Sequence, residues 1–368
     1  MEVMLVVEQL RRAVAGEASG IGTYTLGLLQ GLATMGAEAP AVVLHASRAG
    51  STPDPLLRHG HPVRASVLPG PLLTRAWDHH LLGAPGPSVD VVHATSLAFP
   101  AAEKSPPLSL MVHDLAWREV PEAYPPRGRR WHEAALQRAV SGARLMLVPA
   151  RSAADALLAA GAPHARVEVV AEGSDHLPPA DVEGARRILE RLGVRDGFVL
   201  SVATLQPRKN LRRLLEAYTI ARSEMAEPWP LVVVGPHGWG EGLPADEVPH
   251  GAVLAGEVRG AELAGLYRQA RCLAFVPLVE GFGLPPVEAM RECTPVVASA
   301  VPSVAGTSSV LEVDPLDVRA IATALVQASS DDRIRSELVT AGLELTTDMT
   351  WEKAARRHVE LWQTMERR

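Results

Sequence analysis

Short runs of apolar residues alternate along the first half of the chain with longer segments in which apolar residues recur every three or four positions. The runs have the length of buried strands, and the longer segments have the period of amphipathic helices. Strands are predicted at Val3–Val7, Ala41–His45, Val63–Leu68, Val89–His93, Leu108–His113, Leu145–Pro149 and Val167–Val170. Helices are predicted at Thr25–Met35, Leu72–Leu82, Trp131–Ala143 and Ser152–Ala160. This alternation predicts a parallel α/β sheet.

The periodicity stops at Gly173–Glu183 and then starts again, which predicts a linker followed by a second α/β domain. Strands are predicted there at Phe198–Ala203, Leu231–Gly235, Val253–Ala255, Cys272–Val279 and Pro295–Ala298. Helices are predicted at Leu211–Ser223, Ala261–Gln269, Val287–Glu292, Leu316–Ser329, Asp332–Gly342 and Trp351–Arg367. Ser152 and Asn210 are predicted N-caps, because their side-chain oxygens can accept a hydrogen bond from a free helix amide.

Composition narrows the class of protein. The chain has 368 residues, 47% of them hydrophobic, and no apolar run reaches the length of a membrane span. Glu2 in the first strand does not fit a secretion signal, and Cys272 and Cys293 can form neither a disulfide framework nor a zinc site. A cytoplasmic location is therefore expected. The net charge is −6 without a basic block, so nucleic acid is not an expected partner. The sequence has no basic amphipathic helix of the kind that binds a membrane surface.

The stretch 280–288 carries the first candidate site. Two glycines, Gly281 and Gly283, follow an apolar run and precede Pro285 and Pro286, which predicts a strand, a sharp turn and a helix start. Glu280 is expected on the loop and Glu288 in the first helical turn, beside amides that favour anions. Such a pair of carboxylates can hold a sugar and a ribose together. The competing interpretation is a glycine turn with two solvated carboxylates.

A second candidate site lies at Thr204–Asn210, directly after a predicted strand. Arg208 and Lys209 precede a helix N-terminus there, and the whole chain has only three lysines. Two such cations make a diphosphate site that needs no metal. The competing interpretation is a surface basic pair. Neither half has an Asp-x-Asp pair or a carboxylate triplet, so no metal is expected, and the glycine-rich stretch 234–240 lacks the order of a nicotinamide site.

Three stretches of the first half could contribute to a site. Gly20-Ile-Gly22 is interpreted as a glycine turn that feeds a helix, where free amides could bind a phosphate or simply cap the helix. His113 and Asp114 follow a predicted strand, at the sheet edge where parallel sheets bind ligands. The competing interpretation for His113 is a histidine that only hydrogen-bonds its loop. Thr95 and Ser96 follow the neighbouring strand.

Together these pieces resemble a retaining glycosyltransferase of the GT-B fold, family 4, a group with many bacterial mannosyl-, glucosyl- and rhamnosyltransferases. The resemblance covers nearly the whole chain and rests mainly on Pro207–Asn210 and Glu280–Glu288. It implies two Rossmann-like domains that face each other across a cleft, with the final helix crossing back to the first. The expected domains are 1–175 together with 350–368, for the acceptor, and 176–349, for the donor.

The resemblance also implies roles for individual residues. Arg208 and Lys209 would hold the diphosphate, Glu288 the ribose and Glu280 the sugar, with His113 beside the sugar at the reaction centre. Further donor contacts are expected at Gly20, Gly22, Thr204, Asn210, Gly281, Phe282, Gly283 and Leu284. Acceptor contacts are expected near Thr95, Ser96, Asp114 and Trp117. In the family's favoured reaction, the departing phosphate helps to deprotonate the acceptor, and the sugar keeps its anomeric configuration.

Two departures from the family pattern concern the site. Glu172-Gly173 stands where Asn-Gly is common, and the stretch after Ser303 lacks an expected Leu-Pro-Glu, which bears on donor preference.

The expected activity is metal-independent transfer of a hexosyl group from a nucleotide sugar to an unidentified glycan, lipid or small molecule. No cofactor is expected. GDP-mannose is the first donor expected, then a UDP- or dTDP-sugar. The alternatives are a sugar-nucleotide-binding protein without activity, a pseudo-glycosyltransferase, an epimerase and a dehydrogenase.

Overall fold

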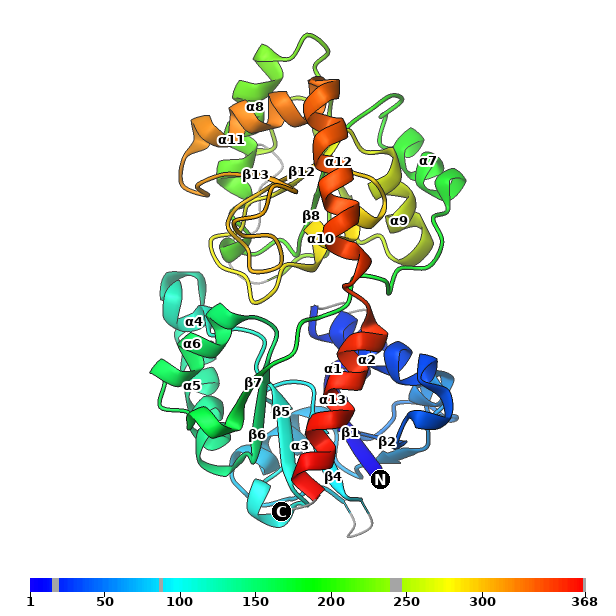
Figure 1. The fold of residues 1–368 in the computed structure, drawn as a ribbon, viewed down its shortest axis with the longest axis vertical. Helices are drawn as coiled ribbons and strands as arrows, with labels where there is room; N and C mark the ends of the chain where they lie inside the picture. The colour runs from blue at the N-terminus through cyan, green and yellow to red at the C-terminus, as the bar shows by residue number, and fades with distance from the viewer. Residues whose placement is uncertain (15–19, 86–88, 239–246, 367–368) are drawn as a thin grey trace. The chain divides into compact units, whose positions relative to one another are not determined.

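The chain folds into two compact α/β units, and each is described here by itself (Figure 1). The computed structural model describes residues 1–14, 20–85, 89–238 and 247–366. The first unit comprises Met1–Trp117, Pro126–His176 and Thr350–Arg368, and the second comprises Arg118–Pro125 and Leu177–Met349. The two sheets are parallel throughout, which confirms the predicted fold class.

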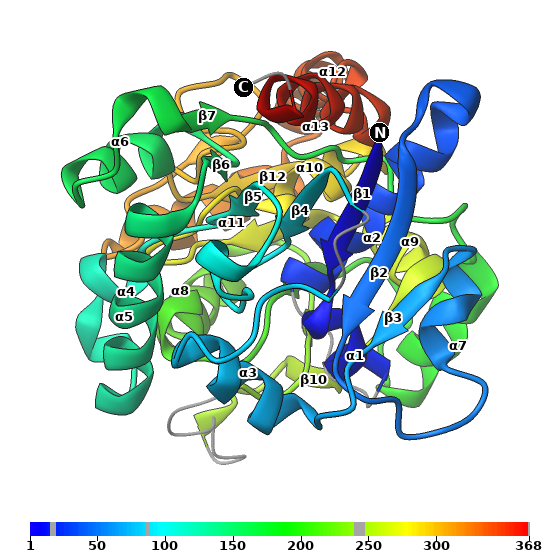
Figure 2. The same ribbon diagram turned by 90° about the horizontal axis from the view of Figure 1, so that it is seen from below.

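The sheet of the first unit has the strand order β3-β2-β1-β4-β5-β6-β7, which Figure 2 shows from one edge to the other. Its strands are β1 (Glu2–Val6), β2 (Ala41–Ala46), β3 (Val63–Ala65), β4 (Val91–Ala94), β5 (Leu108–Met111), β6 (Leu145–Val148) and β7 (Val167–Val169). Its helices are α1 (Glu8–Val14), α2 (Gly20–Thr34), α3 (Gly70–Asp78), α5 (Pro126–Gly142), α6 (Arg151–Ala159) and α13 (Trp351–Glu366). The short helix α4 (Ala116–Glu119) begins in this unit, and its last two residues belong to the second. Every residue of β4, β5 and β6 is buried, because helices cover both faces of a parallel sheet.

Helix α13 packs along α2 within the first unit. Gly27 and Gly31 make this packing possible, since they lie four residues apart on one face of α2. A Cβ atom at Gly27 would overlap the indole ring of Trp351, and one at Gly31 would overlap the backbone of the same residue. The close approach of the two helices therefore depends on the missing side chains.

The second unit is built in the same way, with the strand order β10-β9-β8-β11-β12-β13. Its strands are β8 (Val199–Val202), β9 (Leu231–Val234), β10 (Ala252–Gly256), β11 (Cys272–Phe275), β12 (Val296–Ala298) and β13 (Leu311–Glu312). Its helices are α7 (Val182–Arg191), α8 (Leu211–Glu224), α9 (Gly260–Gln269), α10 (Leu284–Arg291), α11 (Val318–Ser330) and α12 (Asp332–Thr347). Successive side chains of β8 point to opposite faces of the sheet, so they belong to different hydrophobic cores. Leu200 packs in the core with α9 and α10, and Val199 packs in the core with α8 and α11.

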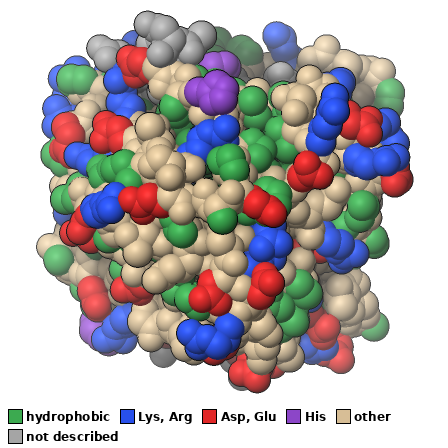
Figure 3. All heavy atoms as spheres, turned by 90° about the horizontal axis from the view of Figure 1, so that it is seen from above, with side chains coloured by type: hydrophobic (Ala, Val, Ile, Leu, Met, Phe, Trp, Pro, Cys, Tyr) green, Lys and Arg blue, Asp and Glu red, His purple; other side chains and the backbone are tan. Residues whose placement is uncertain are grey.

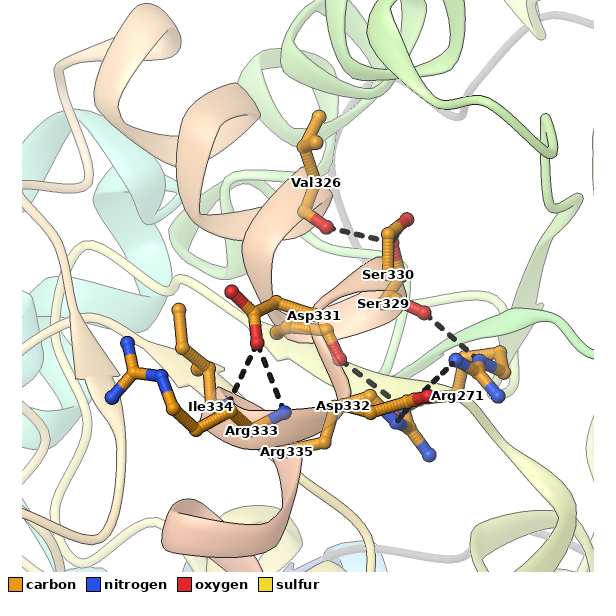
Figure 4. A network of polar contacts seen from close by, with 10 residues as sticks. Arg271, Val326, Ser329, Ser330, Asp331, Asp332, Arg333, Ile334 and Arg335 are labelled. Atoms are coloured by element: carbon orange, nitrogen blue, oxygen red, sulfur yellow. Dashed lines mark hydrogen bonds and ion pairs between the residues drawn. The ribbon is translucent and has the colours of Figure 1, made fainter.

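The corner between α11 and α12 is held by a polar network (Figure 4). Asp331 ends α11 and begins α12, and its side chain accepts hydrogen bonds from the amides of Arg333 and Ile334. Arg271, just before β11, donates from Nε to the carbonyl oxygen of Ser329 over 2.9 Å. These bonds satisfy the helix ends and attach the corner to the sheet.

Charged side chains of both signs are interspersed over the described part of the face that Figure 3 shows. Several surface charges of the second unit are paired: Arg268 lies 2.7 Å from Glu292 and Arg319 lies 2.7 Å from Glu224. Mixed charges of this kind produce no strong field of a single sign.

Three local predictions are wrong. Ser152 lies inside α6, whose N-cap is Ala150 without a side-chain bond, because the helix begins one residue earlier than predicted. The stretch 20–22 is the first turn of α2 and not a turn ahead of it. Its conformation is set by Tyr24, whose buried ring and hydroxyl anchor that end of the helix. The predicted linker also includes the start of α7, which Asp181 caps by accepting from the amide of Gly184 over 2.8 Å.

Candidate active site

The strand order of the second unit reverses direction between β8 and β11, which is a topological switch point. The chain runs from β8 to β9 and β10 on one side, and then returns to β11 on the other side of β8. In open parallel sheets, ligands bind outside the carboxyl ends of the strands at such a switch point. The loops that begin there are 203–210 after β8 and 276–283 after β11, and they contain both candidate motifs of this unit.

Arg208 and Lys209 meet Glu280 between these loops. Lys209 Nζ donates to Glu280 Oε2, and Arg208 Nη1 lies 3.3 Å from the same oxygen and 3.3 Å from the carbonyl oxygen of Val279. The three side chains are only 11% to 15% exposed. Lys209 Nζ also lies 5.2 Å from the centre of the Phe275 ring. The structure thus brings together three predicted site residues, of which Glu280 lies 72 positions after Arg208 and 71 after Lys209.

The charge of Glu280 follows from these neighbours. Burial alone would raise the pKa of its carboxyl group, but Lys209 and Arg208 outweigh burial and hold that pKa below its ordinary value. Glu280 is therefore an anion between two cations. An external anion such as a phosphate would find both cations already in place, and it would compete with Glu280 for them.

Asn210 connects the two loops. It stands at the N-cap position of α8, but its backbone is left-handed, with φ 60°, and its side chain makes no cap bond, so its predicted capping role is wrong. Its Nδ2 donates to the carbonyl oxygens of Val276, over 3.0 Å, and Pro315, over 2.7 Å. Asparagine tolerates the left-handed region, which the sequence alone cannot distinguish from capping.

Gly283 forms the turn into α10, with φ 98°. A Cβ atom there would lie 2.8 Å from Val301 Cγ2 and 3.0 Å from Ser303 Oγ, so only glycine fits. Ser303 Oγ donates to the carbonyl oxygen of Gly283 over 2.7 Å, which places the loop after β12 directly beneath the glycine turn. The side chains of Phe282 and Leu284 are buried in the core, so only their backbone could contact a donor.

Glu288 is the fifth residue of α10, and the prediction that it lies in the first turn is wrong because the helix begins at Leu284. Its carboxylate is buried and accepts a hydrogen bond of 2.6 Å from the hydroxyl of Tyr267. Burial and the Glu288 charge raise the pKa of Tyr267 well above its ordinary value, so the phenol stays a donor. Tyr267 was missed in the sequence, where it is one apolar-face residue of α9; the signal was that a buried phenol needs a partner.

Thr204 lies half-buried at the end of β8, beside the loop after β9. A Cβ atom at Gly238 would lie 2.9 Å from Thr204 Cγ2, and Leu205 forms an isolated parallel bridge with His237. These contacts bring part of the glycine-rich stretch 234–240 to the switch point. Its last two residues, Trp239 and Gly240, lie outside the described residues.

His113 follows β5 in the first unit, and both of its ring nitrogens face protein acceptors. Nε2 lies 3.0 Å from the carbonyl oxygen of Thr95, and Nδ1 lies 3.4 Å from Oε1 of Glu172. The ring packs edge-on against Tyr24, with 4.9 Å between ring centres. Burial lowers the pKa of His113, but the bond to Glu172, the Glu172 and Asp114 charges and the bond to Thr95 together outweigh burial, and the net pKa is raised. The sequence shows Glu172 only as a departure from the family pattern, since its partner lies far away along the chain.

Tyr24 also belongs to a buried chain of hydrogen bonds whose directions can be assigned. Burial lowers the pKa of His358 to about 4 and that of His93 well below its ordinary value, so both rings are neutral. His358 Nδ1 lies 2.7 Å from the carbonyl oxygen of Ala354 and must donate to it, so Nε2 accepts from the Tyr24 hydroxyl over 2.8 Å. The phenol oxygen then accepts from His93 Nε2 over 3.1 Å. His93 Nδ1 is left to accept from Ser109 over 3.0 Å.

The four residues expected near the acceptor are already engaged within the first unit. Thr95 is buried and donates to the carbonyl oxygen of Val6 over 3.0 Å, and Ser96 Oγ accepts from the amide of Ala98 over 3.2 Å. Asp114 accepts from the amide of Ala116 over 3.1 Å. Trp117 stacks on His132, with 4.8 Å between ring centres.

Gly20 and Gly22, the donor contacts expected from the first unit, both lie in the first turn of α2. Gly20 is exposed and Gly22 is buried.

Two absences apply to the described part of the chain only. Among those residues, no group of three or more His, Cys, Asp or Glu side chains is arranged to hold a metal ion. The helices of the same residues include none that is both long enough and apolar enough to cross a membrane.

Both halves of the chain match models of known protein families. The family model described as Glycosyltransferase Family 4 matches residues 18–176, and the model described as Glycosyl transferases group 1 matches residues 190–344. O-antigen chain mannosyltransferase B of Escherichia coli is 30% identical over 264 residues, which cover 69% of each chain. D-inositol 3-phosphate glycosyltransferase of Corynebacterium urealyticum is 30% identical over 226 residues, 55% of this chain and 52% of that one.

A solved structure of Anabaena HepE in complex with UDP and glucose is similar over 99% of this chain and 100% of that one, with a TM-score of 0.75 and 17% sequence identity. At that identity the likeness concerns the fold.

Proposed function

Because the chain belongs to the family 4-type GT-B glycosyltransferases, and so is a hexosyltransferase with a nucleotide-sugar donor, we propose that it transfers mannose from GDP-mannose, with retention and without a metal. The observation that carries the proposal is the cluster of Arg208, Lys209 and Glu280 at the switch point of the second unit. Two cations held in place there can stabilise the negative charge of a departing diphosphate. Mannose is favoured because the Escherichia coli relative with 30% identity is named a mannosyltransferase.

The donor is held by residues of both loops. Its diphosphate replaces Glu280 as the partner of Arg208 and Lys209, and the released Glu280 carboxylate accepts hydrogen bonds from sugar hydroxyls. Amides of residues 281–283, at the start of α10, face the same anion. Glu288 accepts from the ribose hydroxyls, and the bond from Tyr267 fixes its orientation. Thr204 and Asn210 shape the loop after β8.

In the reaction, the bond between C1 of the sugar and the diphosphate oxygen breaks. A bond between C1 and the acceptor oxygen forms on the same face, and the acceptor proton passes to the departing diphosphate. His113, with Gly20 and Gly22, is the proposed contribution of the first unit to the reacting sugar and phosphate. The acceptor contacts this unit near Asp114 and Trp117.

A cytoplasmic location is part of the proposal. It is supported by the cysteines, since Cys272 is buried and Cys293 is exposed, and both are free thiols.

A thermal-shift panel of GDP, UDP, dTDP, ADP and NAD, without and then with magnesium, tests the proposal. A ligand that binds only the folded state stabilises it by about 2.7 kcal/mol at a hundredfold excess over its Kd. Stabilisation by GDP without metal, followed by mannose transfer from GDP-mannose, is the expected result. Stabilisation by UDP or dTDP alone would move the donor to that base, and stabilisation only by NAD would contradict the proposal. Interconversion of the free donor without an acceptor would indicate an epimerase instead.

A further inference from the structure

The surroundings of His113 leave no acceptor role for its ring. The Thr95 carbonyl oxygen, 3.0 Å from Nε2, can only accept a hydrogen bond. The Glu172 carboxylate, 3.4 Å from Nδ1, can likewise only accept when it is ionised. A neutral imidazole carries one N–H and would leave one of these oxygens facing a bare nitrogen. Both oxygens are satisfied only if the ring carries a proton on each nitrogen.

The burial of the Glu172 carboxylate also favours a charged ring at His113. The side chain of Glu172 is 5% exposed and that of His113 is 17% exposed, so both groups of the pair are largely shielded from water. A buried carboxylate without a cation is costly, which favours the charged form of its partner. The Tyr24 hydroxyl does not compete for the ring, since it is engaged with His93 and His358.

The other titratable groups that face the His113 ring do not disfavour its protonated form. Asp114, the next residue in the chain, favours the cation. His93, from β4, is neutral because burial lowers its pKa well below the ordinary value. Burial also keeps Tyr24, from α2, protonated by raising its pKa. His113 is therefore surrounded by two carboxylates and two neutral side chains.

We propose that Glu172 is a positioning residue that keeps His113 doubly protonated and cationic at neutral pH, so that His113 supplies positive charge to the reaction and does not act as its base. The role in catalysis rests on the proposed transferase function, whereas the protonation state does not. A cationic ring has no lone pair with which to take the proton of the acceptor hydroxyl. That proton must leave by another route, which agrees with its transfer to the departing diphosphate.

The protonation state can be measured without any substrate. Long-range proton–nitrogen NMR spectra of the protein labelled with ¹⁵N histidine, recorded at about pH 7.5, distinguish one protonated ring nitrogen from two. The His113 signal is identified by its absence in a His113→Gln variant, or by its displacement in Glu172→Gln. Two protonated nitrogens are expected. One protonated and one bare nitrogen at that pH would overturn the proposal.

The catalytic role is tested by the pH dependence of Glu172→Gln. Glu172 makes the largest contribution that raises the pKa of His113, so without this carboxylate the pKa falls and fewer rings stay cationic at about pH 7.5. The kcat/KM of the variant is expected to fall roughly tenfold at that pH and to recover to nearly the wild-type value at about pH 5.5. Glu168→Gln is the matched control, since it removes an exposed carboxylate from β7 that pairs with Arg357 at the surface.

The outcomes separate the two proposals. An equal loss at both pH values would make Glu172 merely structural, and no loss at either would show that the charge of His113 is irrelevant; both results overturn the catalytic role. A wild-type protein that binds no nucleotide and transfers no sugar would contradict the proposed function instead, and the NMR result would still decide the state of the ring.

Discussion

The Tyr24 hydroxyl lies 2.8 Å from Nε2 of His358, and this hydrogen bond joins α2 to α13 across 334 residues of sequence. With Tyr24 as the donor, this bond requires a neutral His358, because a protonated Nε2 could not accept. Burial lowers the pKa of His358 from 6.5 to about 4. The contact between the two helices is thus tied to a proton equilibrium.

The first unit should lose stability in mild acid. Between pH 6.5 and about 4, His358 binds a proton in the unfolded chain but not in the folded chain. The free energy of unfolding therefore falls as the pH falls. The full difference is on the order of 3 kcal/mol. Urea unfolding of the wild type and His358→Gln over this range measures it. The variant should show a shallower decline, and parallel declines would show that His358 is not responsible.

Gly27→Ala should destabilise the first unit. The new methyl group would overlap the ring of Trp351, so α2 and α13 must separate, at a cost of roughly 1–3 kcal/mol or more. Gly20→Ala is the matched control, since no atom lies within 4 Å of a Cβ there. Thermal unfolding should show a lower Tm for the first variant and little change for the second. Equal Tm values would mean that the helices are not in contact as described.

Tyr267→Phe should weaken donor binding without abolishing the fold. The change removes the 2.6 Å hydrogen bond to Glu288, which frees the carboxylate to turn and costs about 1–3 kcal/mol of stability. We expect the Kd for the nucleoside diphosphate to rise roughly tenfold, the equivalent of about 1.4 kcal/mol. Tyr218→Phe is the control, because it also removes a buried hydroxyl from the second unit. That hydroxyl lies within hydrogen-bond distance of the carbonyl oxygens of Trp229 and Gly251 and accepts from Arg222. If both variants bind alike, the Glu288 contact is not part of the donor site.

Glu280→Gln should separate binding from turnover. Removing the charge takes away the anion that competes with a diphosphate for Arg208 and Lys209, so a nucleoside diphosphate should bind as tightly as to the wild type or more tightly. Transfer from the complete donor should nevertheless fall, since the carboxylate that holds the sugar is lost. Calorimetric titration and initial rates measure the two effects. Weaker diphosphate binding in the variant would contradict the exchange of Glu280 for phosphate.

The sequence predicted the strands and helices well, because buried parallel strands are nearly continuous apolar runs and their helices keep a regular period. It also indicated Arg208, Lys209 and Glu280, since each follows a strand. It could not indicate which buried side chains meet across the fold. Glu172 and Tyr267 gain their roles from partners on other elements, and Gly27 and Gly31 from a helix at the far end of the chain.

Two of the local errors have a common cause. Asn210 and Gly20 each belong to residue types that suit two backbone conformations, and the sequence around them does not choose between the two. Contacts made after folding do: Asn210 is held by the carbonyl oxygens of Val276 and Pro315, and the first turn of α2 is held through Tyr24.

The central claim is that Arg208 and Lys209 form a diphosphate site that works without a metal. Calorimetric titration of Lys209→Ala with GDP in the presence of a chelator tests it most directly, with Lys353→Ala, a lysine of α13 in the first unit, as the control. Loss of one charge-assisted contact should raise the Kd at least about tenfold in the first variant and leave it unchanged in the second. If GDP does not bind the wild type, the nucleoside diphosphate that the thermal-shift panel selects takes its place. Unchanged affinity in Lys209→Ala would contradict the account.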